Sequence, residues 1–253
     1  MTLPKDFFKH PFAHRALHDV RAGRPENAMS SIKAAMAAGY GIEVDLQLSK
    51  DGVPMVFHDD NLQRLTPQFG LPREFTAKEL GAMRLTHGRE GIPTFEALLD
   101  AVAGCVPLLV EIKDQSGELG PETGEMEAQV CLLAAAYRGP IALMSFNGFS
   151  VGKCAEFAPD VPRGLVTDAF LAEEWPGVPA ARLAHLAEIA DFDDVGACFI
   201  SHNHRDLGMP VVAKLKDDGV PVACWTVRSE AEEVRAREVA DQVTFEGYLA
   251  DIG

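Results

Sequence analysis

Short apolar segments alternate with helical segments along nearly the whole chain of 253 residues. The alternation predicts eight strands, at residues 12–14, 42–48, 108–112, 141–144, 164–166, 197–200, 220–226 and 242–245. Strands and helices that alternate in this way are typical of a parallel sheet. Eight such units in roughly 250 residues favour closure into a (β/α)8 TIM barrel. No GxGxxG motif follows the first strand, which weakens the alternative of an open nucleotide-binding sheet.

The connections between these strands predict helices and one insertion. Helices are expected at residues 27–38, 94–103, 122–137, 149–157, 180–189, 209–218 and 229–239. Residues 53–57 follow a Lys-Asp-Gly turn and should pair back on the second strand. Residues 59–93 then break the alternation, because polar residues, Pro and Gly are frequent there. We therefore expect residues 1–253 to form a single barrel domain with a small insertion after strand two, at about 59–93.

The charge and the distribution of apolar residues limit the partners. A formal net charge of −15 argues against nucleic acid, because binding of a phosphate backbone needs clusters of Lys and Arg. No segment approaches the roughly 20 apolar residues of a membrane span, and the first residues lack the apolar core of a signal peptide. Five scattered cysteines fit a reducing compartment. We expect a cytoplasmic protein, and the sequence does not indicate its oligomeric state.

Three carboxylates occupy positions where a barrel strand is normally apolar. Glu43 and Asp45 are two residues apart on the second predicted strand and so share a face, and Glu111 is in the next strand along the chain. Carboxylates on the inward face of a covered strand are unfavourable unless they are paired or bind a cation. Because hard divalent cations prefer oxygen ligands, these three residues predict a site for Mg²⁺ or Ca²⁺.

Histidine and basic residues stand at the same ends of the predicted strands. His14 and Arg15 end the first strand, His58 ends the hairpin arm and Lys113 follows the third strand. Arginine makes bidentate contacts with phosphate, and lysine supplies a point charge. Two histidines can act as general base and general acid near neutral pH. Together with a metal, this set indicates cleavage of a small-molecule phosphodiester.

The chain resembles the glycerophosphodiester phosphodiesterase family. The resemblance is carried by residues 14–66, which begin HRALHDVRAGRPEN, and by IPTFEALL (92–99), LLVEIK (108–113), LMSFN (143–147) and CWTVR (224–228). It implies a (β/α)8 barrel with a small insertion after strand two. It also implies metal-dependent hydrolysis to an alcohol and sn-glycerol 3-phosphate, with water or a substrate hydroxyl as the nucleophile.

The resemblance implies a role for each of the residues above. Glu43, Asp45 and Glu111 would bind Mg²⁺ or Ca²⁺, and His14 and His58 would form the acid–base pair. Arg15 and Lys113 would contact the phosphate.

Three positions depart from the family pattern. Ala16 replaces the glycine of HRG, which indicates that unusual backbone freedom is not required there or that the loop differs. Ala28 replaces the threonine of PENT and removes a hydroxyl near the first helix. Glu246 follows Phe245 where relatives often carry Thr-Asp, so no polar role is assigned at the end of the last strand.

Other residues have weaker signals. Trp225 is predicted to form a wall of the substrate pocket, because aromatic residues commonly line such sites, and Phe146 could be wall or core. His202 and His204 are more typical of structural residues than of a metal site, because no third ligand is placed. His18 is expected in a solvated loop.

Three other functions remain open. The same residues could serve a phosphodiesterase for lysophospholipids or another headgroup. The fold alone also permits a metal-dependent isomerase or lyase, and a catalytically silent binding barrel.

Overall fold

The computed structural model describes residues 2–252, in which parallel strands close into a barrel. The barrel strands are β1 (Phe12–Ala13), β2 (Gly41–Leu48), β4 (Leu108–Ile112), β5 (Ile141–Ser145), β6 (Arg163–Thr167), β7 (Ile200–Asn203), β8 (Val222–Val227) and β9 (Gln242–Phe245). Each pairs in parallel with its neighbour in this order, and β1 pairs with both β9 and β2, which closes the barrel. The predicted (β/α)8 TIM barrel is confirmed.

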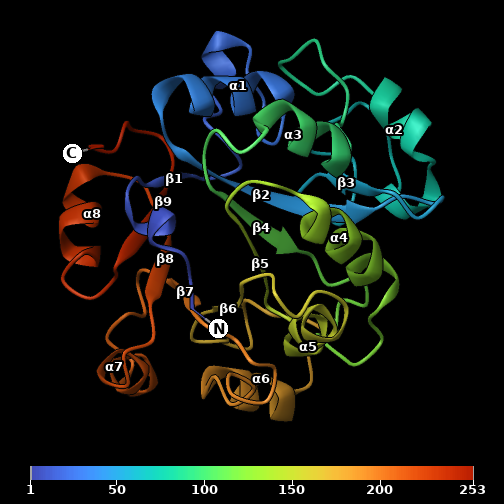
Figure 1. Cartoon of the computed structure of the whole chain (residues 1–253). Coiled ribbons are helices and arrows are strands. Elements are labelled where there is room, and N and C mark those ends of the chain that lie inside the picture. Colours follow the sequence, from blue (N-terminus) through green and yellow to red (C-terminus); the bar gives the residue numbers. More distant parts are fainter. Residues whose placement is uncertain (1, 253) are drawn as a thin grey trace.

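Helices cover the outside of this barrel, as Figure 1 shows. They are α1 (Met29–Ala38), α3 (Phe95–Val102), α4 (Glu125–Ala136), α5 (Gly148–Phe157), α6 (Ala180–Ala187), α7 (Pro210–Asp217) and α8 (Glu230–Ala236). Within residues 2–252 no helix follows β9. Instead the Tyr40 hydroxyl donates a hydrogen bond to the Ala250 carbonyl, which fastens the end of the chain beside β2. Among these residues no helix is both long and apolar enough to cross a membrane.

The barrel interior is filled at its amino-terminal end. Phe7 lies on the 3-10 helix η1 (Lys5–Phe8), and its ring stacks on that of Phe12 with centroids 5.6 Å apart. The side-chain amide of Gln242 donates to the carbonyls of Phe7 and His10, at 2.8 and 3.0 Å. Because this end is closed by packed side chains, the polar cavity of the barrel opens at the carboxyl ends of the strands, where TIM-barrel enzymes place their active sites.

The insertion is an ordered subdomain beside the barrel. The antiparallel strand β3 (Pro54–Val56) pairs with β2, and 3-10 helix η3 (Pro72–Glu74) and helix α2 (Ala77–Ala82) follow it. A separate apolar cluster holds it together, made by Ala28, Met55, Phe57, Leu62, Leu65, Leu80, Leu85 and Ile92. The insertion therefore packs against the start of α1, and it places polar side chains within reach of the barrel.

Strand β7 lies three residues further along the chain than predicted. The apolar segment 197–200 suggested its position, but the strand runs from Ile200 to Asn203. His202 is fully buried in it, and its ring bonds the Thr167 hydroxyl at 2.7 Å and the Asp206 carbonyl at 3.2 Å. Burial lowers the pKa of His202 to about 4, so the ring is neutral. An apolar pattern misses this strand because the polar side chain finds its partners only in the folded barrel.

Helix α1 is capped from the insertion. Its N-cap residue Ala28 has no side-chain acceptor, as expected from the missing hydroxyl. The Glu90 carboxylate instead accepts a hydrogen bond of 2.9 Å from the backbone N–H of Ser30. A negative group at this end of a helix also interacts favourably with the helix dipole. Glu90 thus replaces the missing cap and joins the insertion to the barrel.

We expect Glu90→Ala to lower the free energy of unfolding by about 1 kcal/mol, because an N–H group of α1 loses its acceptor. Ala28→Ser in the Glu90→Ala background should recover part of this loss, since a serine hydroxyl can cap the same turn. Urea denaturation of the variants measures both effects. Equal stability of Glu90→Ala and the parent protein would show that this contact is not a cap.

Candidate active site

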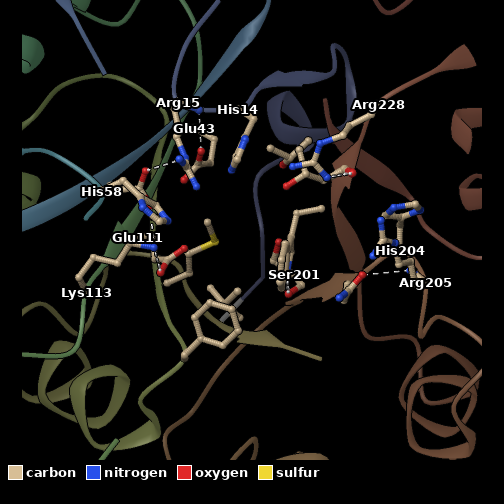
Figure 2. Close-up of a pocket in the computed structure, with 18 residues that line it drawn as sticks. His14, Arg15, Glu43, His58, Glu111, Lys113, Ser201, His204, Arg205 and Arg228 are labelled. Carbon is tan, nitrogen blue, oxygen red and sulfur yellow. Dashed lines mark hydrogen bonds and ion pairs between the residues drawn. The ribbon is translucent and has the colours of Figure 1, made fainter. Parts of the chain in front are cut away.

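All the residues predicted for the site line one cavity of about 210 Å³ at the carboxyl ends of the strands. They are His14, Arg15, Glu43, Asp45, His58, Glu111, Lys113 and Trp225. Figure 2 shows two sides of this cavity: one with Glu43, Glu111, His58 and Lys113, and the other with Arg228, His204 and Arg205. The fold thus gathers residues from five separate segments of the chain into one charged site.

Three buried carboxylates lie side by side in the cavity. Glu43, Asp45 and Glu111 are 2%, 1% and 7% exposed, and oxygens from all three lie within 4.8 Å of one another. Their proximity follows from the sheet, because Asp45 on β2 is paired directly with Glu111 on β4. The buried side-chain oxygen of Asn27 lies in the same region without a hydrogen-bond partner among residues 2–252, while its amide nitrogen donates to Asp45. The three carboxylates could hold a metal ion, and oxygen ligands are those that hard divalent cations prefer.

Basic groups only partly balance this charge. The Lys113 ammonium lies 2.8 Å from Asp45 and 2.6 Å from Glu111. Burial opposes ionisation of Asp45, but Lys113, His58 and Arg15 outweigh it and hold the pKa of Asp45 far below its usual range. Burial together with the charges of Asp45 and Glu111 raises the pKa of Glu43 well above its usual value. Burial and the like charges thus favour the neutral form of Glu43, whereas the basic groups favour the charged form of Asp45.

The turn after β1 wraps around Glu43. The backbone N–H of Arg15 donates to the Glu43 carboxylate at 2.9 Å, and the N–H of Ala16 donates to the Glu43 carbonyl at 3.0 Å. Both turn residues are left-handed, with φ of 51° at Arg15 and 63° at Ala16. Of the two interpretations of Ala16, the one in which position 16 needs no unusual backbone freedom is therefore wrong. Alanine adopts the conformation at some steric cost, because the hydrogen bonds to Glu43 fix the turn.

His14 is held by a carboxylate from the far end of the chain. Its Nδ1 lies 2.6 Å from Oε2 of Glu246, and the Nε of Arg228 donates to Oε1 of Glu246 at 2.7 Å. Burial lowers the pKa of His14, although the hydrogen bond to Glu246 acts in the opposite direction. His18 lies 3.5 Å from the same carboxylate and does not line the catalytic cavity. No polar role was assigned to Glu246 from the sequence, whereas in the structure its carboxylate is hydrogen-bonded to His14 and orients it.

His58 has an equivalent arrangement that involves the insertion. Its Nδ1 lies 2.8 Å from Asp59, whose carboxylate accepts two hydrogen bonds of 2.7 Å from Arg64. The guanidinium of Arg64 also bonds both oxygens of Glu26 at 2.7 Å, and Glu26 in turn accepts a 2.7 Å bond from Arg15. Glu26, His58 and Asp59 are close enough to hold a metal, but Arg64 already engages both carboxylates. One arginine of the insertion thus links His58 to Arg15.

The polar residues on the opposite wall of the cavity were not predicted from the sequence to belong to the site. Ser201, Asn203, His204 and Arg205 line it at the end of β7, and Arg228 lines it after β8. A correct position for β7 would have indicated the first four, because polar residues at carboxyl ends of barrel strands line the site. Phe146 and Trp225 also line the cavity, with ring centroids 5.6 Å apart. The indole N–H of Trp225 donates to the Ser201 carbonyl at 2.9 Å, which fixes the orientation of this wall.

This fold and site define a TIM-barrel enzyme whose charged centre suits an anionic substrate. The sequence profile of the glycerophosphoryl diester phosphodiesterase family matches residues 14–243. The Bacillus subtilis protein YhdW, provisionally named a glycerophosphodiester phosphodiesterase, is 27% identical over 233 residues, covering 87% of this chain and 88% of YhdW. A glycerophosphodiester phosphodiesterase of Caldanaerobacter subterraneus is 30% identical over 158 residues, covering 60% and 65% of the two chains.

A solved structure shares this fold. A phosphodiesterase of Oleispira antarctica, solved in complex with the product sn-glycerol-3-phosphate, superposes with a TM-score of 0.75 at 23% identity, and the match covers 96% of this chain and 93% of that one. The profile match spans nearly the whole chain, and the chain belongs to the glycerophosphoryl diester phosphodiesterase family. It is therefore an enzyme of the phosphodiesterase class.

We expect Glu246→Gln to lower kcat about 10- to 100-fold, as is usual when the partner that orients an active-site histidine is changed. Because Glu246 raises the pKa of His14, its neutralisation should lower that pKa further and shift the acid limb of the kcat/KM profile to lower pH. Glu238→Gln, a change at an exposed residue just beyond the end of helix α8, is the control. A wild-type rate and profile for Glu246→Gln would exclude the orienting role.

Arg64→Gln should also lower kcat about 10- to 100-fold, because Asp59 and Glu26 lose their shared partner and His58 and Arg15 are released. Arg64→Lys should be intermediate, since lysine keeps the charge without the planar fork. Steady-state kinetics with kcat and KM separated measure the effect, and Arg73→Gln on the same insertion serves as a control that should change neither by more than about twofold. Unchanged kcat in Arg64→Gln would show that the network does not position the site.

Proposed function

We propose that this enzyme hydrolyses glycerophosphodiesters to an alcohol and sn-glycerol 3-phosphate, with a divalent metal and an acid–base pair of histidines. The observation that carries the proposal is the pair of carboxylate-bound histidines, His14 and His58, in one cavity with three buried carboxylates. A related structure contains sn-glycerol-3-phosphate as its product, which supports this choice of product.

The residues present fit a divalent cation. Glu43, Asp45 and Glu111 supply oxygen ligands within 4.8 Å of one another, and burial together with the charges of Asp45 and Glu111 raises the pKa of Glu43. Mg²⁺ or Ca²⁺ suits such ligands better than zinc does. When bound, the cation supplies electrostatic stabilisation of the phosphoryl oxygens and offsets the repulsion between the acidic cavity and an anionic substrate.

The side chains divide the remaining chemistry. Arg15 and Lys113 contact the phosphate, and their own contacts with Glu26, Asp45 and Glu111 hold them in position. His14, neutral because burial lowers its pKa, accepts the proton of the attacking hydroxyl through Nε2, since Nδ1 faces Glu246. His58, whose Nδ1 faces Asp59, donates a proton through Nε2 to the oxygen of the departing alcohol. With water as the nucleophile, one P–O bond forms, the bond to the alcohol breaks, and sn-glycerol 3-phosphate is released. With a substrate hydroxyl, the same exchange gives a cyclic phosphate, which water then opens by a second exchange of P–O bonds.

The polar character of the cavity favours glycerophosphodiesters over lysophospholipids. Apart from Met144, Phe146, Val166 and Trp225, its lining side chains are charged or polar. An acyl chain gains about 0.8 kcal/mol of binding free energy for each CH₂ group that it buries, and this burial requires an apolar surface. A three-carbon polyol and a phosphate instead match the hydrogen-bonding groups that are present.

The assay of this proposal is release of sn-glycerol 3-phosphate from glycerophosphocholine and glycerophosphoethanolamine, after treatment with EDTA and with Mg²⁺ or Ca²⁺ restored. We expect no turnover in EDTA and recovery on addition of one of these metals. His14→Ala and His58→Ala should each lower kcat about 10²- to 10⁴-fold, the usual contribution of general acid–base catalysis. Glu43→Ala should raise the metal concentration needed for half-maximal activity. Full activity in EDTA, or in both histidine variants, would contradict the proposal.

A further inference from the structure

A second cavity of about 600 Å³ adjoins the catalytic cavity at its His58 end. We call it the side cavity. The two share His58, Glu111, Lys113, Phe146 and Trp225 as lining residues. His14, Arg205 and Arg228 line only the catalytic cavity. A group bonded to the phosphorus on the side of His58 would therefore enter the side cavity, away from His14 and the basic wall.

Aromatic rings form a rigid wall of this side cavity. The ring of Phe146 has its centroid 4.9 Å from that of Trp175 and 5.6 Å from that of Trp225. The indole N–H of Trp175 donates to the buried carboxylate of Asp168 at 3.2 Å, so this ring is fixed by a hydrogen bond as well as by packing. Aromatic walls held in this way attract cations, and quaternary ammonium groups in particular.

The charged groups of the side cavity are mostly acidic. Glu174 lies at its exposed rim, and within residues 2–252 its carboxylate makes no hydrogen bond or ion pair. Asp60 also lines the rim and accepts only a long 3.3 Å bond from Gln47. Asp114 is occupied by hydrogen bonds to the loop that follows it and to Asn147. The Lys113 ammonium is engaged by Asp45 and Glu111, so the open charges of the side cavity are negative.

We propose that the side cavity binds the departing alcohol and selects alcohols that carry a positive charge, amino or quaternary ammonium alcohols. This inference rests on the proposed function, and it names the class of headgroup that the same site prefers. The phosphate occupies the catalytic cavity, the alcohol oxygen lies at His58, and the cationic end of the alcohol meets Trp175, Glu174 and Asp60. A neutral polyol gains neither the ring contact nor the charge attraction, and an anionic alcohol is repelled.

The test compares substrates of equal shape. Glycerophosphocholine and its 3,3-dimethylbutyl analogue differ only in that a neutral carbon replaces the quaternary nitrogen. We expect kcat/KM of the wild-type enzyme to be about three- to tenfold higher for the choline ester, which is the range of cation–π and partly screened charge attraction. Equal kcat/KM for the two esters would overturn the proposal.

Variants of the side cavity test whether its residues cause the preference for the choline ester. In Trp175→Leu, and in the double variant Asp60→Asn with Glu174→Gln, the ratio of the two kcat/KM values should fall to within about twofold of unity. Glu173→Gln removes an equal charge one residue away that does not line the side cavity, and its ratio should match the wild type. A ratio that persists in both test variants would also overturn the proposal.

The substrate panel separates this inference from the function on which it rests. Hydrolysis of both esters at equal rates contradicts the preference for cations and leaves the phosphodiesterase activity standing. With metal bound, failure to hydrolyse either ester or glycerophosphoglycerol contradicts the proposed function, and the inference fails with it.

Discussion

Three carboxylates buried side by side at the carboxyl ends of β2 and β4 are the constraint on which the rest of the site depends. The pairing of Asp45 with Glu111 across these strands fixes their separation, and the two-residue spacing of Glu43 and Asp45 places a third charge on the same face. Such a cluster is unstable without positive charge. Lys113 supplies part of that charge from within, and burial beside Asp45 and Glu111 raises the pKa of Glu43. The proposed divalent cation would complete the balance and make an acidic enzyme receptive to an anionic substrate.

The surrounding structure orients the groups that act beside this centre. Each histidine is bonded through Nδ1 to a carboxylate, and each carboxylate is bonded to an arginine: Glu246 to Arg228, and Asp59 to Arg64. The two arginines lie in different parts of the chain: Arg228 is in the loop after β8, and Arg64 is in the insertion. The insertion therefore contributes to the structure of the site, since Glu90 caps α1 and Arg64 holds Asp59 beside His58. The aromatic wall at that same side continues into the acidic side cavity, so the support of His58 and the selection of the alcohol are built from neighbouring elements.

Local sequence patterns were sufficient to predict most of the fold and the residues of the charged centre. The alternation of strands and helices predicted the barrel, and carboxylates at strand positions that should be apolar predicted Glu43, Asp45 and Glu111 as neighbours. The contacts that hold the side chains around this centre could not be predicted from the sequence. Glu246 is 232 positions along the chain from its partner His14, and Arg64 is 38 positions from its partner Glu26. Only the closed barrel brings them together. The shift of β7 has the same cause, since His202 is acceptable inside a strand only because Thr167 and Asp206 are there to bond it. Ala16 shows the converse, in which the hydrogen bonds to Glu43 impose a left-handed backbone on a residue that does not favour it.

The most direct measurement of the central claim is anomalous diffraction from crystals of the enzyme soaked in Mn²⁺, a cation with oxygen preferences like those of Mg²⁺. The account predicts one strong anomalous peak bounded by oxygens of Glu43, Asp45 and Glu111, and no peak in the same position in crystals of Asp45→Asn. A peak between Glu26, His58 and Asp59 with Arg64 displaced, or the absence of any peak at the three buried carboxylates, would contradict it.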